Sequence, residues 1–117
     1  MEPAYRYRAK LDRVVDGDTV DVLIDLGFYV ELQERVRLAG INTPEIYRVK
    51  KDSEEYKKGM EAKEYVERRL NENGNEMVIE TEKRGKWRRW LAKVYLKDSS
   101  KTLNDELVEK GLAETVK

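Results

Sequence analysis

The sequence predicts an α+β domain in which a five-stranded β-barrel is accompanied by two helices. Its length of 117 residues fits one domain with a single modest core. Apolar residues alternate with polar ones in five short runs, and two other segments carry apolar residues at helical spacing. The apolar share of 39% is therefore patterned rather than diluted, which excludes a disordered chain. We treat residues 1–117 as one domain.

The first three predicted strands span residues 5–11, 20–26 and 32–41, where apolar and polar side chains alternate. An Asp-Gly-Asp sequence at residues 16–18 predicts the turn between the first two strands. Gly40 lies inside the third run, where a glycine is expected to mark a bulge or a close backbone approach.

A polar stretch over residues 46–52, expected to be a mobile loop, precedes the first predicted helix. Asp52 and Glu55 have the spacing of a capping box, and residues 73–74 (Asn-Gly) predict the end of the helix. Its apolar face consists of Ala62, Tyr65, Val66 and Leu70.

Two further strands are predicted at residues 77–81 and 91–96, joined by a basic hairpin turn over residues 83–89. A second short helix begins at Leu103 and is capped near Gly111. The order is three strands, a helix, two strands and a helix. An OB barrel places a helix between its third and fourth strands, so the order predicts an OB fold.

The composition excludes several classes of function. The chain has no His and no Cys, which rules out Ser-His-Asp and Cys-His catalysis, disulfides and ordinary His/Cys zinc sites. Lys and Arg balance Asp and Glu at 24 each, so polyanion binding has to come from local clusters of positive charge. No apolar run is long enough for a membrane span, and we expect no membrane partner. We expect a cytoplasmic protein if Met1 is the native start, and a secreted one if a leader was removed.

The first cluster of candidate functional residues is the acidic turn that contains Asp16 and Asp18. Two carboxylates flank a glycine at a strand junction, so both can lie near one point. Such hard oxygen ligands favour Ca²⁺ or Mg²⁺. An ordinary hairpin turn is the alternative, because Asp-Gly is a frequent turn dipeptide.

The second cluster begins with Arg37 on the third strand and continues at the end of that strand with Asn42, Thr43 and Glu45. A guanidinium fixed on a strand is a natural bidentate partner of a phosphate. The alternative is that Arg37 forms a surface ion pair and that Pro44 merely ends the strand.

The third cluster is the basic turn at residues 83–90, in which cations interleave with two indoles. Cations can bind a nucleic-acid backbone while an aromatic face stacks on a base. A solvated charged turn with one Trp in the core is the alternative. Taken together, the three clusters suit phosphodiester hydrolysis assisted by a hard cation.

Five segments together resemble the staphylococcal nuclease family in order and spacing, over nearly the whole chain. They are Val14–Val20, Arg37–Glu45, Lys86–Ala92, and the helical Gly59–Ala62 and Asn104–Ala113. The resemblance implies an OB fold and a Ca²⁺-dependent endonuclease that acts on DNA and RNA and leaves 3′-phosphates. We expect single-stranded substrates to be preferred and the protein to be a monomer.

The resemblance also implies a metal site. Asp18 matches the first calcium ligand of the family, Thr43 would supply its backbone carbonyl, and Asp16 would act in the outer shell. Asn42 stands where the family usually has a second Asp ligand. Because calcium affinity depends on ligand charge, this departure predicts weaker binding or the use of Mg²⁺ or Mn²⁺ instead.

The catalytic and nucleic-acid-binding roles follow in the same way. Glu45 matches the general base of the family, and Arg37 and Arg89 match its two phosphate-binding arginines. Nucleotide contacts are expected from the basic turn, where Trp87 replaces a Tyr of the family and Arg88 replaces a Gly. The residues assigned to nucleic-acid binding are Arg84, Lys86, Trp87 and Arg88.

Two alternatives to an active nuclease stay open. The chain ends soon after Gly111, so the third C-terminal helix of the best-known relatives is expected to be absent. Together with Asn42, this favours a catalytically weak or silent OB module that binds nucleic acid or a protein partner, as in the Tudor staphylococcal nuclease proteins. A purely structural domain is the remaining alternative. DNA or RNA preference is not determined by the sequence.

Overall fold

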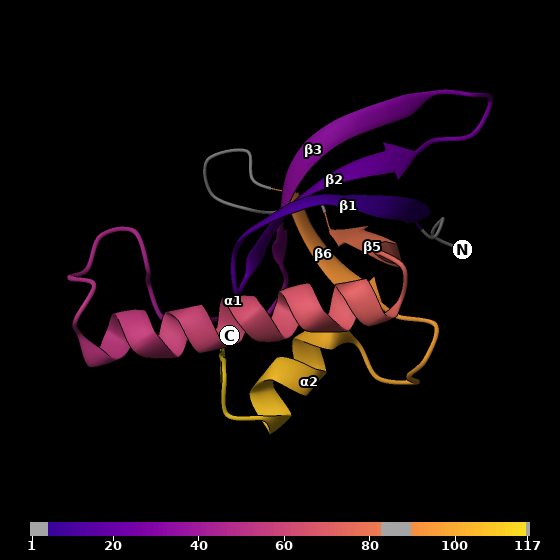
Figure 1. The fold of residues 1–117 in the computed structure, drawn as a ribbon. Helices are drawn as coiled ribbons and strands as arrows, with labels where there is room; N and C mark the ends of the chain where they lie inside the picture. Colours follow the sequence, from indigo (N-terminus) through magenta and orange to yellow (C-terminus); the bar gives the residue numbers. More distant parts are fainter. Residues whose placement is uncertain (1–4, 83–89, 117) are drawn as a thin grey trace.

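A computed structural model of the chain describes residues 5–82 and 90–116 and shows seven strands and two helices within them (Figure 1). In chain order they are β1 (Arg6–Asp16), β2 (Thr19–Asp25), β3 (Glu31–Leu38), β4 (Ile41–Asn42), α1 (Glu54–Glu72), β5 (Glu76–Glu82), β6 (Trp90–Tyr95), α2 (Leu103–Glu109) and β7 (Glu114–Thr115). The basic turn at residues 83–89 lies outside the described residues.

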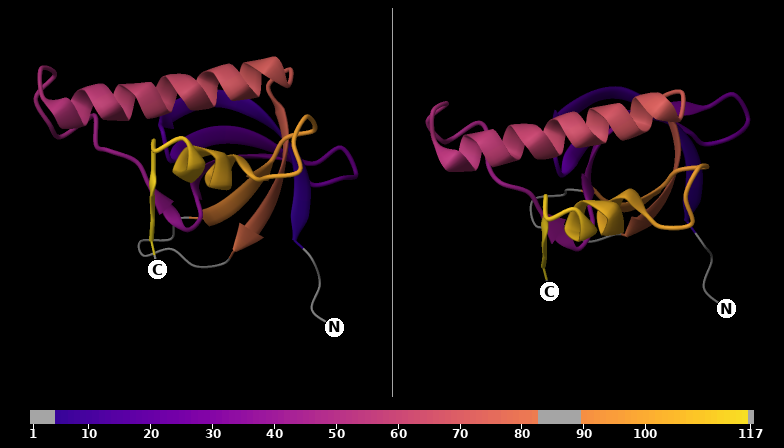
Figure 2. Two further views of the ribbon diagram at one scale, coloured as in Figure 1. Left: turned by 90° about the horizontal axis from the view of Figure 1, so that it is seen from below. Right: turned by 60° about the horizontal axis from the view of Figure 1, so that its bottom comes forward.

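Five of the strands close into a barrel in the order β1-β2-β3-β6-β5. All neighbouring pairs are antiparallel except β3 and β6, which pair in parallel from Val36 opposite Trp90 to Leu38 opposite Ala92. Helix α1 packs along β1 and α2 packs against β6 (Figure 2). The predicted fold class, a five-stranded OB barrel with two helices, is thereby confirmed.

The first strand is longer than the alternation predicts, because β1 continues to Asp16. Its pairing with β2 shifts register between Leu11 and Arg13 and again between Val14 and Asp16. Such bulges change which face a side chain occupies, and Val14 and Val15 are both buried as a result. The sequence prediction of a strand ending at residue 11 is wrong for this reason.

The third predicted strand is in fact two strands. β3 ends at Leu38, and Gly40 adopts a φ of +76°, in the left-handed region that glycine enters without steric cost. The chain then leaves the barrel, and β4 pairs instead with β7. Gly40 is thus the turn between two strands, not a bulge within one.

The N-cap of helix α1 lies one residue later than predicted. Ser53, not Asp52, is the N-cap, and its hydroxyl accepts a 3.2 Å hydrogen bond from the backbone N–H of Tyr56. The helix ends as predicted, with Asn73 at the C-cap and Gly74 at a φ of +69°. Residues 46–52 contain no helix or strand.

The hairpin between β2 and β3 has an unusual tip. Gly27, Phe28 and Tyr29 all have positive φ values, of 80°, 56° and 63°. The side chains of Phe28 and Tyr29 are fully exposed. Bulky residues rarely adopt this backbone conformation, so the tip is strained without any compensating burial.

The core fills the barrel and the layer beneath the two helices. Helix α1 contributes Ala62, Val66 and Leu70, and α2 contributes Leu103 and Leu107. Most of the other buried apolar side chains lie on the strands, largely at the alternate positions that face the interior. No helix of the described residues is long and apolar enough to cross a membrane.

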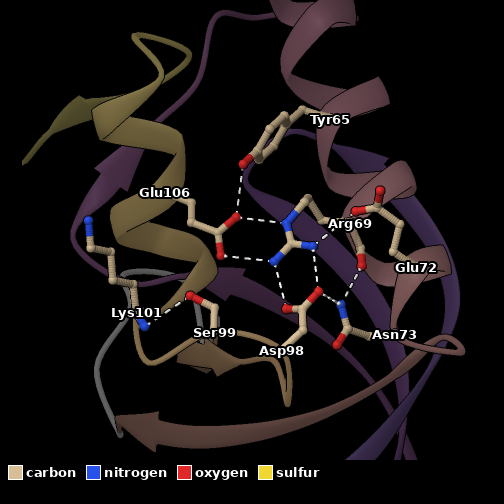
Figure 3. Close-up of polar contacts among 8 residues, drawn as sticks. All are labelled: Tyr65, Arg69, Glu72, Asn73, Asp98, Ser99, Lys101 and Glu106. Carbon is tan, nitrogen blue, oxygen red and sulfur yellow. Dashed lines mark hydrogen bonds and ion pairs between the residues drawn. The ribbon is translucent and has the colours of Figure 1, made fainter.

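A polar network around Arg69 fastens the two helices to one another (Figure 3). Arg69 Nε donates a 2.8 Å hydrogen bond to Glu106 on α2, and its two terminal nitrogens bind Asp98 at 2.8 and 2.9 Å. Tyr65 also donates to Glu106, at 2.8 Å. The hydrogen bonds from Arg69 lower the pKa of Asp98 from its ordinary 3.8 to about 2.

Candidate functional site

The acidic turn between β1 and β2 holds a buried carboxylate. The Asp18 residue is only 8% exposed, although its side chain is ionisable. Its Oδ1 accepts a 3.0 Å hydrogen bond from the Thr19 hydroxyl, and its Oδ2 accepts a 3.1 Å hydrogen bond from the Thr43 backbone N–H. Asp18 therefore ties the turn to the loop that follows β4.

Asp16 stabilises the turn by a hydrogen bond, and its pKa depends on the neighbouring Asp18. Its Oδ1 accepts a 3.0 Å hydrogen bond from the Asp18 backbone N–H. Burial, followed by the side-chain hydrogen bond and the charge of Asp18, raises the pKa of Asp16 to about 7. Burial also acts to raise the pKa of Asp18, but hydrogen bonds from Asp16 and Thr43 and the charge of Arg37 outweigh it and lower that pKa. Asp18 is thus the firmly ionised member of the pair.

Gly17 is required by the space around the turn. A Cβ at this position would lie 2.7 Å from Ala62 Cβ on α1 and 2.9 Å from Thr43 Cγ2. Helix α1 makes a similar approach further along, where a Cβ on Gly59 would lie 2.6 Å from the carbonyl oxygen of Pro44. The two glycines therefore let α1 pack directly on the turn and on the loop after β4.

Arg37 brings the turn and the loop to one point. Its Nη2 donates a hydrogen bond to Asn42 Oδ1 and lies 3.5 Å from Asp18 Oδ2. Two oxygens from different parts of the fold thus converge on a single cationic nitrogen. The Arg37 side chain is 29% exposed, so this point is open to solvent.

Glu45 is held by its own loop. Its Oε1 accepts hydrogen bonds from the backbone N–H groups of Ile46 at 3.2 Å and Tyr47 at 2.9 Å. Its own N–H donates to Glu55 of α1, at 3.3 Å. No described residue donates to its Oε2, and no hydrogen bond joins Glu45 to Arg37 or Asp18 within the described part of the chain.

The structure thus gathers five of the residues selected from the sequence into one connected group: Asp16, Asp18, Arg37, Asn42 and Thr43. Glu45 lies two residues beyond this group, and its carboxylate is bonded elsewhere. The basic-turn residues Arg84, Lys86, Trp87, Arg88 and Arg89 lie outside the described residues. Their roles, like those of the gathered group, stay predictions.

Apart from Arg37, the gathered group offers oxygen ligands, and this donor set fits a hard cation. It contains two carboxylates, the Asn42 amide oxygen and the Thr43 backbone carbonyl, the ligand types that Ca²⁺ prefers. The Thr43 hydroxyl oxygen is also buried, with no hydrogen-bond partner in the part of the chain that the structure describes. The negative charge is low: within residues 5–82 and 90–116, no cluster of three or more Asp, Glu, His or Cys side chains could hold a metal.

Two of the hollows in the described surface lie away from this site. Two hollows of about 510 and 590 Å³ lie on the described surface, and their lining includes none of Asp18, Arg37 and Asn42. The convergence of polar atoms is the stronger indication, because a cation or a phosphate needs placed ligands more than an apolar cavity.

One positioning residue was missed from the sequence. Asn104 on α2 is buried, and its Nδ2 donates to the carbonyls of Ala39 at 2.9 Å and Ala92 at 3.1 Å. Its Oδ1 accepts from Val94 N–H at 3.0 Å. The available signal was an Asn between the apolar Leu103 and Leu107, in the first turn of the second predicted helix.

Comparison with known proteins identifies the family to which the chain belongs. The family described as staphylococcal nuclease homologue matches residues 35–117. The chain is 30% identical to the thermonuclease of Staphylococcus hyicus over 104 residues, with 89% of this chain and 56% of the relative covered. It is 33% identical to the thermonuclease of Staphylococcus intermedius over 101 residues, covering 86% and 55%. An uncharacterized protein of Methanocaldococcus jannaschii is 30% identical, covering 92% and 58%. The chain therefore spans little more than half the length of these relatives.

Proposed function

Because the chain belongs to the staphylococcal nuclease family, we propose that it is a calcium-dependent endonuclease that hydrolyses phosphodiester bonds of DNA and RNA and leaves 3′-phosphates. The observation that carries this proposal is the convergence of Asp18 Oδ2 and Asn42 Oδ1 on Arg37 Nη2. The oxygens that could bind a cation are therefore in direct contact with the guanidinium that could bind a phosphate. Relatives that carry the name thermonuclease support the reaction class.

The cation would be held by Asp18, the Asn42 amide oxygen and the Thr43 backbone carbonyl, with Asp16 in the outer shell. When bound, calcium would polarise a phosphoryl oxygen as a Lewis acid. The neighbours of Asp18 lower the pKa of its carboxyl group, which favours the ionised form that binds a cation. Mg²⁺ or Mn²⁺ are the alternatives, since Asn42 reduces the charge of the ligand set.

Arg37 would change partners during the reaction. In the structure its Nη2 is engaged by Asn42 and Asp18. With a cation held at those oxygens, Arg37 would instead bind the phosphate, where Arg89 would be the second donor. Loss of one donor to a developing oxyanion typically costs about 3 kcal/mol of transition-state stabilisation.

Glu45 would act as the general base. Both of its loop hydrogen bonds fall on Oε1, which keeps the carboxylate in place and leaves Oε2 for the attacking water. The basic turn, through Arg84, Lys86, Trp87 and Arg88, would hold a strand of nucleic acid by backbone contacts and stacking, with single strands preferred.

The test is cleavage of single-stranded DNA by the purified chain, in calcium and in chelator. We expect calcium-dependent products that end in 3′-phosphate, and their loss in Glu45→Ser. Glu64→Ser is the matched control, because Glu64 is an exposed glutamate on α1. Folded protein that shows no cleavage with calcium, magnesium or manganese would contradict the proposal.

A second candidate, a silent OB module that binds nucleic acid, is favoured by one observation. Asn42 is neutral and already engaged by Arg37, so the ligand set is weaker than one with a second carboxylate. Binding of a single-stranded oligonucleotide without cleavage, at saturating calcium, would select this candidate.

A further inference from the structure

The last described strand places an acidic residue beside the candidate site. β7 pairs antiparallel with β4, with Thr115 opposite Ile41 and Glu114 opposite Asn42. The Val116 N–H donates a 2.8 Å hydrogen bond to the carbonyl of Gly40, which fixes this register. Figure 2 shows the C-terminal segment, in yellow, beside the purple β4. Nothing in the sequence pattern indicated this pairing, because both strands are only two residues long.

The register determines which face of the two-stranded sheet Glu114 shares. Side chains of directly opposite residues in an antiparallel pair project from the same face, about 5 Å apart at Cβ. The Asn42 side chain on that face accepts a hydrogen bond from Arg37. Glu114 therefore belongs to the face on which Asn42, Arg37 and Asp18 meet.

The Glu114 carboxylate is free to act there. Its residue is exposed, and it forms no hydrogen bond or ion pair with any residue that the structure describes. Two acidic side chains of α2 differ in this respect, since Glu106 is bonded to Arg69 and Glu109 to Lys101.

The candidate cation site has little negative charge of its own. Asp18 is the one carboxylate among its proposed inner ligands, Asn42 is a neutral amide, and Arg37 adds a positive charge beside both. Cation affinity at oxygen-ligand sites rises with the number of charged ligands. A carboxylate on a side chain whose Cβ lies about 5 Å from that of Asn42 would offset part of the missing charge by Coulomb attraction to the cation.

We propose that Glu114 is a positioning residue of the cation site, supplying from β7 the negative charge that Asn42 does not supply from β4. This inference rests on the proposed function, because it assumes that a divalent cation binds at Asp18 and Asn42. Glu114 strengthens that binding and is not itself a group that touches the scissile phosphate.

The test is calorimetric titration of calcium into the purified chain without nucleic acid. Glu114→Gln keeps the length and hydrogen-bonding capacity of the side chain, and we expect it to weaken calcium binding by about tenfold. Glu64→Gln is the control, because it removes the same charge from an exposed position on α1, and its affinity is expected to match the wild type.

A rescue variant separates charge from structure. Asn42→Asp restores a carboxylate on the same face, so Asn42→Asp/Glu114→Gln is expected to bind calcium about as tightly as the wild type. Thermal melting of each variant, without calcium, reports the integrity of the β4–β7 pair. A loss of affinity that follows a lower melting temperature and is not rescued by Asn42→Asp would assign Glu114 a structural role and overturn the inference.

Two outcomes distinguish this inference from the proposed function. If Asp18→Asn abolishes calcium binding while Glu114→Gln leaves it unchanged, the inference fails and the proposed function stands. If the wild type binds neither calcium, magnesium nor manganese at millimolar concentration, both fail.

Discussion

Asn104 on α2 reaches the turn after β3, where its Nδ2 donates a 2.9 Å hydrogen bond to the carbonyl oxygen of Ala39. The same amide group also bonds both polar groups of β6 that lie nearest, the Ala92 carbonyl and the Val94 N–H. The parallel pairing of β3 with β6 ends at Leu38 and Ala92. The Asn104 amide thus replaces the next rung of the ladder with a side chain, and it holds the chain where it turns toward Asn42.

Replacement of this amide is expected to be costly. Asn104→Ala leaves buried backbone groups of Ala39 and Val94 without their side-chain partner, and each such group costs on the order of 1–3 kcal/mol. We expect the free energy of unfolding to fall by about 3 kcal/mol in urea denaturation. Asn71→Ala, at an exposed position on α1, is the control and should change it little. An Asn104 variant as stable as that control would refute the role of the amide.

The packing of α1 on the acidic turn predicts a coupled pair of substitutions. Gly17→Ala brings a methyl group to within 2.7 Å of Ala62 Cβ, and overpacking of this kind costs about 2 kcal/mol. Ala62→Gly removes the nearest clash but costs about 1 kcal/mol in helix propensity. The double variant should therefore be less destabilised than the sum of the single ones. Chemical denaturation of all four proteins measures this coupling, and strict additivity would contradict it.

The hairpin tip is expected to tolerate stabilising changes. Phe28 and Tyr29 occupy left-handed backbone conformations, for which Asn and Gly are the preferred residues in tight hairpins. Because both side chains are fully exposed, their replacement gives up no core packing. We expect Phe28→Asn/Tyr29→Gly to raise the free energy of unfolding by about 1 kcal/mol. A fall in the melting temperature would show that the aromatic side chains make contacts absent from this structure.

The Arg69 network predicts how stability depends on pH in acid. The pKa of Asp98 falls from 3.8 to about 2 because Arg69 donates hydrogen bonds to its carboxylate. A group whose folded pKa is depressed stabilises the protein above its unfolded pKa, and this contribution is lost as the pH falls through the folded value. Asp98→Asn should therefore flatten the loss of stability between about pH 4 and pH 2. Melting temperatures across that range measure the effect, with Asp52→Asn, at an exposed position, as control. Parallel curves of melting temperature against pH for the wild type and Asp98→Asn would contradict this contribution of Asp98.

Much of the fold follows from local patterns. Alternation located five barrel strands, and the spacing of Ala62, Val66 and Leu70 located the buried face of α1. The misplaced boundaries have physical causes that leave little trace in the sequence. Bulges after Leu11 break the alternation of β1. Asp52 and Ser53 are both suitable N-cap residues, and in the structure Ser53 caps the helix.

The site was predictable to the extent that its residues lie near one another in the sequence or share a strand end. The acidic turn and Arg37 with Asn42 could be selected as clusters, and the structure brings them together. Asn104 and Glu114 reach the same region only through α2 and the β4–β7 pair. Both depend on long-range pairing, which a pattern in one segment of the sequence does not encode.

The parallel contact between β3 and β6 has a consequence for the order of folding. Arg37 lies opposite Leu91 in that contact, and the two strands are separated along the chain by α1 and β5. Closing such a long loop is entropically expensive, and contacts of high sequence separation form slowly. A chain that has formed only its local elements pairs Arg37 with Thr19 in the β2–β3 hairpin, but Arg37 still lacks its neighbour Leu91 on β6. If the proposed function holds, cleavage is expected only after the barrel closes, and partly folded molecules should be inert toward nucleic acid even when most of their secondary structure is present.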